Sequence, residues 1–230
     1  MFARDRKQEM AHLILTTFDW LPEFPRGYVR DIRIRWALEE AGLPYSVEGV
    51  PFKERDADHF KHQPFGQVPW LTDGDVTIFE SGAAVLHIAE KSDVLLPSDA
   101  KGRSEVIKWL FAALNSVEAA SLPWFIFQFT GNGEESDGRE AINDFLSSRL
   151  SHMEDVLESK DWLTDRFSAA DIVMVDVFRV IDRFDGLSNY PVCRNYMKRA
   201  EDRPAFKKAL ADQIGHFKQA DLREAVMDSN

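Results

Sequence analysis

Two short segments in the first third of the chain hold the residues best suited to bind a small charged ligand. They cover residues 63–72 and 78–86 and read QPFGQVPWLT and IFESGAAVL. Ser81 opens a predicted helix, where free N–H groups and the positive dipole end can hold a carboxylate. Glu80 offers a negative charge to an ammonium group. Each residue alone also fits a structural role, as an N-cap or a first-turn charge, but the joint spacing favours a ligand site.

The surrounding residues predict alternating strands and helices. Ile32, Trp36 and Ala37 have helical spacing, and Gly42 suits the left-handed position that ends a helix. Asp73-Gly74 is a favoured hairpin turn between two short apolar runs. The expected elements are strands at 12–18, 45–50, 68–72 and 76–79, helices at 29–41 and 81–91, and an irregular segment after residue 50.

The rest of the chain predicts helices alone. These cover residues 103–120, 140–159, 169–184, 192–201 and 204–213, with a polar, glycine-rich loop at 131–138. A mixed module followed by a helical one indicates two domains. We expect the first domain at 12–92, a linker at 93–101, the helical domain at 102–215, and terminal extensions at 1–11 and 216–230.

In segments 63–72 and 78–86 the chain resembles the cytosolic, bacterial-like glutathione S-transferases. That family has an NP-x-G-x-VP-x-L segment, a short hairpin and a Glu/Gln-Ser pair that opens a helix. Gln63 replaces the usual Asn, and the other fixed elements are present. Further on, a capping box of Ser168 and Asp171, together with Tyr190-Pro191 and the RPAF run at 203–206, resembles structural elements of the family.

The resemblance implies a thioredoxin-like α/β domain followed by an all-helical domain. It also implies that glutathione is the co-substrate. Pro69 would be cis, so that the backbone of Val68 pairs with the cysteinyl unit of glutathione like an added strand. Ser81 would hold the γ-glutamyl carboxylate and Glu80 the ammonium group. By analogy Gln67, or a basic residue such as Lys53 or Arg55, reaches the glycyl carboxylate, although the basic residues also fit ordinary surface positions.

The family needs a donor that steadies the glutathione thiolate, since a free thiol has a pKa of about 8.5. The donor is a Tyr, Ser or Cys near the start of the first helix, and counting back from Ala37 without gaps places it at Tyr28. The loop before Tyr28 is longer than usual and lacks a Ser-Pro or Cys-Pro pair. Arg30 could stabilise the thiolate by charge instead, or be a solvated helix residue.

The helical domain offers aromatic candidates for a pocket that binds the electrophile. The candidates are Trp109, Asn115 and Trp124, and Phe111, Phe125 and Phe127 lie near them in the sequence. Aromatic residues at helical spacing are more often core residues, so this pocket is a hypothesis.

Composition excludes several other classes. A net charge of −11, from 28 basic and 39 acidic residues, argues against nucleic acid or an anionic membrane as partner. The single cysteine, Cys193, rules out an intrachain disulfide, and the six histidines show no metal-ligand spacing. No uninterrupted apolar run reaches the length of a membrane span, and the N-terminus lacks the pattern of a signal peptide. We therefore expect a cytoplasmic protein without a metal.

The sequence thus predicts a glutathione transferase that adds the glutathione thiolate to a small hydrophobic electrophile. Two alternatives stay open: a non-catalytic glutathione-binding or regulatory module of the same fold, and a glutathione-dependent peroxidase or isomerase. The resemblance also implies a homodimer.

Overall fold

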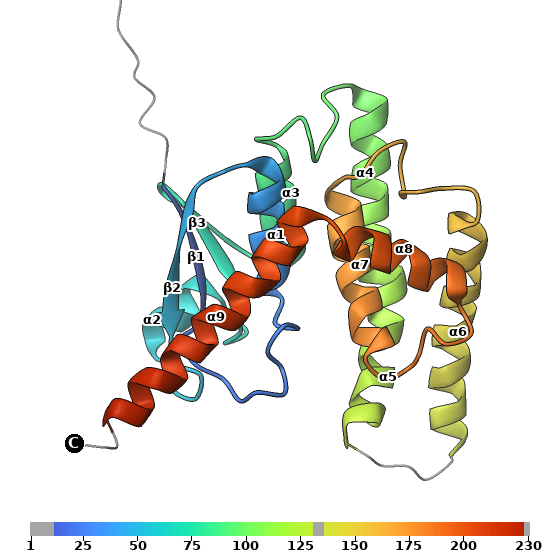
Figure 1. Cartoon of the computed structure of the whole chain (residues 1–230). Coiled ribbons are helices and arrows are strands. Elements are labelled where there is room, and N and C mark those ends of the chain that lie inside the picture. The colour runs from blue at the N-terminus through green and yellow to red at the C-terminus, as the bar shows by residue number, and fades with distance from the viewer. Residues whose placement is uncertain (1–11, 131–135, 228–230) are drawn as a thin grey trace, which may run out of the picture.

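The computed structural model describes residues 12–130 and 136–227. The predicted terminal extension 1–11, most of the predicted loop 131–138, and residues 228–230 lie outside the described residues. The sheet and its helices lie on one side of the molecule and helices α4 to α8 on the other, with α9 returning alongside α1 (Figure 1).

A four-stranded mixed sheet forms the first part of the fold, with strand order β2-β1-β3-β4. Strands β1 and β2 are parallel, whereas β3 is antiparallel to both β1 and β4. The strand bounds are β1 Leu13–Phe18, β2 Tyr45–Val50, β3 Trp70–Asp73 and β4 Val76–Phe79. The predicted strands are therefore present, and β3 begins two residues later than expected.

Three helices accompany the sheet: α1 Asp31–Ala41, α2 Ala57–His62 and α3 Ser81–Ala89. Helix α1 ends at Gly42, whose φ of 64° is the left-handed conformation that the sequence predicted. The prediction of an irregular segment after β2 is wrong where α2 forms. The side chain of Asp56 accepts hydrogen bonds from the N–H groups of Asp58 and His59, which starts this short helix.

The second part of the fold is helical. Helix α4 (Ala100–Ala112) continues through a π-helical segment η1 (Ala113–Glu118) into α5 (Ala119–Thr130), and the other helices are α6 Asp137–Leu157, α7 Ala169–Asp182, α8 Pro191–Glu201 and α9 Pro204–Met227. Helix α3 meets η1 closely, because a Cβ on Gly82 would lie 2.6 Å from a methyl carbon of Leu114. This contact brings the start of α3 next to η1.

The continuous helix 100–130 is long and apolar enough to cross a membrane by length and composition alone. An 18-residue window of this helix has a mean hydropathy of 1.4. Its sequence is not an uninterrupted apolar run, because charged residues such as Lys108 and Glu118 interrupt it. A third of that window is buried, and Val106, Leu110 and Val117 belong to the protein core. The core helix of a folded protein can have the same length and composition, and this helix packs against α7.

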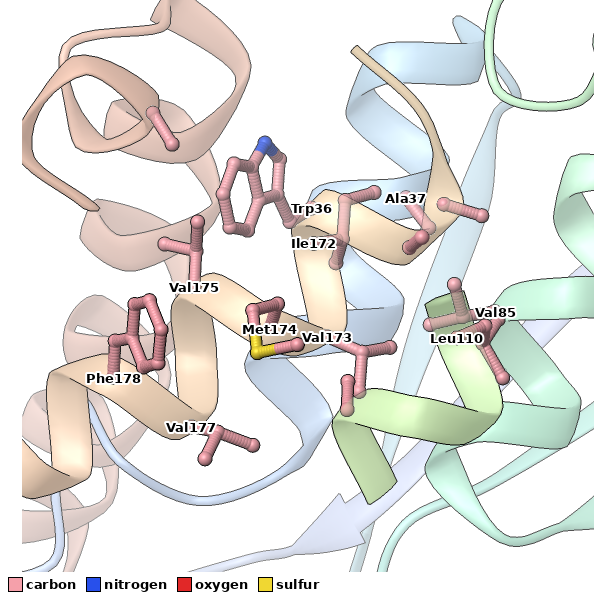
Figure 2. Close-up of a cluster of buried hydrophobic side chains, with 14 of the residues drawn as sticks. Trp36, Ala37, Val85, Leu110, Ile172, Val173, Met174, Val175, Val177 and Phe178 are labelled. Carbon is pink, nitrogen blue, oxygen red and sulfur yellow. The ribbon is translucent and has the colours of Figure 1, made fainter. Parts of the chain in front are cut away.

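Helix α7 is the centre of that core and is buried along nearly its whole length. Its Ile172, Val173 and Phe178 lie among side chains from α1, α3 and α4, including Trp36 and Leu110 (Figure 2). One hydrophobic core therefore extends across both predicted domains.

The N-terminus of α7 has the predicted capping box. The N–H of Ser168 donates to the carboxylate of Asp171 at 2.8 Å. This carboxylate also accepts hydrogen bonds from the Leu163 N–H and the Tyr196 hydroxyl. The interactions of Asp171 are with the protein itself, so its role is structural, as predicted.

Helix α9 is longer than the sequence predicted, since it continues from residue 213 to Met227. Residues 216–221, expected in a terminal extension, pack against the first domain, and Phe217 is fully buried. Gly215 and the polar residues around it weaken the apolar periodicity there, which explains the early end of the prediction.

Candidate functional site

The hairpin of β3 and β4 brings together the two segments that the sequence analysis singled out. Trp70 and Phe79 are the last paired residues of this hairpin. Val68 lies two residues before Trp70 and Ser81 two residues after Phe79, so both residues flank the same end of the hairpin. The segment before β3 and the N-terminus of α3 therefore lie at one end of the hairpin.

The turn before Val68 is held by the side chain of Gln63. Its Oε1 accepts hydrogen bonds from the N–H groups of Phe65 at 2.7 Å and Gln67 at 3.1 Å. The bond between Val68 and Pro69 is cis, as the resemblance implied. Gln63, which stands where the family has Asn, thus supplies the acceptor that fixes this turn.

His59 holds the same turn from the other side, a role that sequence reasoning missed. Its Nε2 lies 2.9 Å from the carbonyl oxygen of Gln67, and its ring packs edge-on against Trp70. The side chain of Gln67 remains exposed. No local signal pointed to His59, because it lies in the segment predicted to be irregular.

Glu80 and Ser81 form the junction between β4 and α3. Glu80 has a φ of 68°, an unusual conformation for a residue with a side chain, and is exposed to solvent. Ser81 is only 5% exposed, and its Oγ accepts a hydrogen bond from Nη1 of Arg33 at 3.3 Å. The first N–H groups of α3 have no partner within the helix, so they are donors for an anion at this point.

Arg33 connects Ser81 to a buried group of charges. Its Nε donates to Asp176 at 2.7 Å and its Nη2 to Glu118 at 2.8 Å. Arg30 donates to the same oxygen of Glu118 at 2.9 Å. Sequence reasoning identified Arg30 but not Arg33, whose partners are 48, 85 and 143 residues away along the chain.

The ion pairs determine the charge state of Glu118. Burial alone would raise the pKa of this carboxyl, but Arg33 and Arg30 outweigh it and hold the pKa below the ordinary value of 4.5. Glu118 is therefore a carboxylate at neutral pH, and the group keeps Arg33 fixed beneath Ser81.

Tyr28, the predicted thiolate donor, lies at the end of the loop between β1 and α1. Its N–H donates to the carbonyl of Pro25 at 3.0 Å. The guanidinium groups of Arg179 and Arg183 lie 4.9 and 4.2 Å from the centre of its ring, within the range of cation–π attraction. The side chain of Tyr28 is half-buried, and both positive charges lie close to its ring.

Tyr28 also lines a cavity of about 170 Å³ between the loop and the helical part. Arg33 lines the same cavity, so one side chain contacts both Ser81 and the cavity wall. The other lining residues are Phe24, Pro25, Arg30, Glu118, Ser121, Leu122, Phe125, Asp176, Val177, Val180 and Arg183.

The loop that carries Tyr28 is tied to the C-terminal half of α9. The carboxylate of Asp221 accepts hydrogen bonds from both terminal nitrogens of Arg26, at 2.5 and 2.7 Å, and from the indole N–H of Trp20 at 2.8 Å. These hydrogen bonds lower the pKa of Asp221 to about 2, so the carboxylate is charged at neutral pH.

Two further contacts from α9 hold the two ends of this loop. Nε2 of His216 lies 2.9 Å from the carbonyl oxygen of Phe18, where β1 ends. The side-chain amide of Gln213 donates to the carbonyl of Val29 at 3.1 Å, just before α1. Helix α9 therefore fixes the start, middle and end of the loop.

The remaining candidates for the first domain lie elsewhere. Lys53 is exposed, and Arg55 donates to the carbonyl of Gly66, which gives Arg55 a structural partner. Neither of these side chains lines the cavity beside Tyr28.

The three residues proposed for the electrophile pocket are not brought together at that cavity. Trp109 is half-buried, Asn115 is exposed on η1, and Trp124 belongs to the core at 7% exposed. Leu122 and Phe125 line the cavity instead. These two residues lie three positions apart on α5, a spacing that marks a shared helix face but not whether it faces a cavity or the core.

Cys193 is buried, which raises the pKa of its thiol, and its N–H donates to Glu154. Within residues 12–130 and 136–227, no three His, Cys, Asp or Glu side chains form a group that could hold a metal ion.

A mixed sheet with its helices, followed by an all-helical part, is a thioredoxin-like domain joined to a helical domain, which confirms the predicted fold class. Residues 25–90 match the family model described as "Glutathione S-transferase, N-terminal domain". Glutathione S-transferase 4 of Zea mays is 47% identical over 60 residues, 24% of this chain and 26% of that protein. A glutathione S-transferase of Dirofilaria immitis is 26% identical over 201 residues, 83% of this chain and 91% of that protein.

Solved structures agree with this fold. A glutathione transferase from Pseudomonas putida, determined with one glutathione disulfide bound per subunit, superposes with a TM-score of 0.75 at 21% identity. The match covers 89% of this chain and 93% of that one. Residues 25–90 therefore form a glutathione S-transferase N-terminal domain, and the chain along most of its length is similar to glutathione S-transferases, as the sequence motifs indicated.

Proposed function

We propose that this protein is a glutathione transferase, which joins the sulfur of glutathione to the electrophilic carbon of a small molecule. The observation that carries the proposal is the position of Ser81. It opens α3, accepts a hydrogen bond from Arg33, and flanks the same end of the β3–β4 hairpin as Val68. This end of the hairpin offers what a tripeptide with two carboxylates and one ammonium group requires.

Each part of glutathione has a complementary group in this proposal. The backbone of Val68 pairs with the cysteinyl unit as an added strand would. Ser81 and the N-terminus of α3 hold the γ-glutamyl carboxylate, and Glu80 receives the ammonium group. The glycyl carboxylate is bound by Gln67, which directly precedes Val68, or by Lys53. Both side chains are exposed to solvent.

Tyr28 steadies the thiolate by donating its phenolic hydrogen to the sulfur. The thiol proton passes to solvent, the thiolate electron pair forms the new S–C bond, and the leaving group departs with its own electron pair. The cavity beside Tyr28 accommodates the electrophile.

Calorimetric titration with glutathione tests the Ser81 site. We expect saturable binding, and we expect Ser81→Ala to lose about 1.5 to 3 kcal/mol, the usual range for a hydrogen bond to a charged group. Ser104→Ala, on the exposed side of α4, is the matched control and should bind like the parent protein. Equal affinity of the parent and Ser81→Ala would contradict the assignment.

Two related functions would use the same glutathione site. The loop before Tyr28 lacks the Ser-Pro or Cys-Pro pair common in the family, which favours a non-catalytic glutathione-binding module as the second candidate. Normal glutathione affinity without a lowered thiol pKa would support that candidate. A substrate panel that includes hydroperoxides would identify a peroxidase instead.

We also propose a cytoplasmic homodimer. Phe65 and Phe79 pack against each other at the hairpin and remain exposed, Phe65 by 69%, and Val76 lies on the same strand as Phe79. Exposed apolar groups of this kind mark protein interfaces. Light scattering on Phe65→Ser, which should shift the protein toward the monomer, tests the proposal.

A further inference from the structure

Building on the function proposed above, we propose that the electrophile has an apolar ring-sized body and a carboxylate, and that Arg183 binds this carboxylate. The proposal starts from the wall of the cavity beside Tyr28. Side chains of Phe24, Leu122 and Phe125 form its aromatic and aliphatic surface, and Val177 of α7 adds to it. A cavity of about 150 Å³ is large enough for benzene, so about 170 Å³ suits one ring.

The carboxylates of this cavity are already neutralised. Glu118 accepts hydrogen bonds from both Arg30 and Arg33. Asp176 accepts from Arg33 on one oxygen and from Arg179 on the other, at 2.7 and 3.0 Å. Arg179 in turn donates to a third carboxylate, that of Glu201. Three guanidinium groups and three carboxylates therefore balance one another.

Arg183 is the additional positive charge of the cavity. Its guanidinium lies 3.9 Å from the centre of the Phe24 ring and 4.2 Å from that of Tyr28, and it donates a hydrogen bond to the carbonyl of Phe24. No carboxylate in the described parts of the chain forms an ion pair with it. The nearest acidic residues in sequence, Asp182 and Asp185, pair with Arg194.

A guanidinium has five N–H donors in a planar fork that matches a carboxylate. One donor of Arg183 is engaged by Phe24, which leaves others for a ligand. The guanidinium lies close to two aromatic rings, and the N–H donors that Phe24 does not engage are left to bind an anion. Because Arg183 contacts Tyr28, a carboxylate bound there keeps the attached ring close to the proposed thiolate.

The test compares 4-chloro-3-nitrobenzoate with its methyl ester, each as an electrophile for glutathione. The thiolate displaces chloride from both, and the two molecules differ in one negative charge. We expect kcat/KM, divided by the uncatalysed rate constant, to be at least about tenfold higher for the acid, the effect of about 1.4 kcal/mol. Arg183→Gln should remove this preference and change kcat/KM for the ester by no more than about twofold. Arg199→Gln, which removes an exposed arginine paired with Asp161, is the control.

Equal rates for acid and ester in the parent protein would overturn the proposal. An equal loss of kcat/KM for acid and ester in Arg183→Gln would also overturn the proposal, since it would mean that Arg183 only holds the loop that contains Phe24. Calorimetric binding of 3-nitrobenzoate and its methyl ester needs no catalysis. Binding of the acid that depends on Arg183, without turnover of either substrate, would support the anion site while rejecting the transferase function.

Discussion

Arg33 holds together three parts of the chain that are far apart in sequence. Its guanidinium contacts Ser81 at the proposed glutathione site, Glu118 on η1 and Asp176 on α7, and its side chain is almost fully buried. Removing one partner of a buried ion pair is costly because the remaining charge stays buried without compensation. The residues around Arg33 therefore determine both stability and the position of Ser81.

Glu118→Gln tests the energetic part of this statement. In the folded protein the pKa of Glu118 lies below 4.5, its ordinary value in an unfolded chain. At a pH between the folded-state pKa and 4.5, the unfolded chain therefore binds the proton more readily than the folded protein does. The stabilisation from the carboxylate is therefore complete above about pH 4.5 and is lost as the pH falls through the folded-state pKa. We expect Glu118→Gln to lower the free energy of unfolding by about 3 kcal/mol at pH 7.

Denaturant unfolding of the parent and Glu118→Gln at several pH values measures this effect. The two proteins should become more similar in stability as the pH falls below about 4.5. Glu105→Gln is a suitable control, since Glu105 pairs with Lys108 on the surface of α4. A stability difference that grows as the pH falls would contradict the assigned charge state.

Substitutions of Gln63 test how the turn before Val68 is fixed. Gln63→Leu removes the acceptor for two N–H groups, and we expect it to lower the free energy of unfolding by about 1 to 3 kcal/mol. Glutathione affinity should fall with it, because Val68 is no longer presented in one position. Gln63→Glu keeps an acceptor oxygen and should retain most of the affinity. Equal affinity of Gln63→Leu and the parent would show that the turn does not need this clamp.

Among the residues of the candidate site, those that lie within the family motifs could be singled out from the sequence. Val68, Glu80 and Ser81 lie in two segments separated by one hairpin, so their proximity follows from local structure. Arg33 and Arg183 were missed because their partners come from distant helices, and an arginine on a helix usually faces solvent. The roles assigned to the residues stay predictions until they are tested.

At the scale of elements, α9 is the least expected feature. Asp221 binds Trp20 and Arg26 of the loop that carries Tyr28, and its pKa of about 2 means that the contact weakens only in strong acid. The sequence did not show this, since one carboxylate near the end of an acidic chain has no distinguishing pattern. Helix caps with local signals, such as Gly42 and Ser168, were predicted correctly.

Asp221→Ala should loosen the loop between β1 and α1. We expect severalfold faster amide hydrogen exchange in residues 19–30, and a lower kcat for conjugation, with exchange in α6 unchanged. Asp212→Ala removes a carboxylate from the same helix that pairs with Lys208, and it serves as the control. Unchanged exchange in residues 19–30 would mean that α9 does not hold this loop.

For the whole molecule, α7 joins the two parts of the fold through one core. Side chains of α1, α3 and α4 pack around it (Figure 2). We therefore expect a single cooperative transition in differential scanning calorimetry, although the sequence suggests two domains. Phe178→Ala should destabilise the protein by about 3 to 5 kcal/mol and keep the single transition. Two separated transitions would contradict a shared core.

The most direct test of the central claim is the pKa of the glutathione thiol when bound. The ultraviolet absorbance of the thiolate is followed against pH in the complexes with the parent protein and with Tyr28→Phe. We predict a bound thiol pKa at least about one unit below the free value of about 8.5, worth about 1.4 kcal/mol, and a return toward the free value in Tyr28→Phe. A lowered pKa that survives the mutation would assign the donor to another residue. Bound glutathione with an unchanged thiol pKa, or no binding at all, would contradict the proposed transferase.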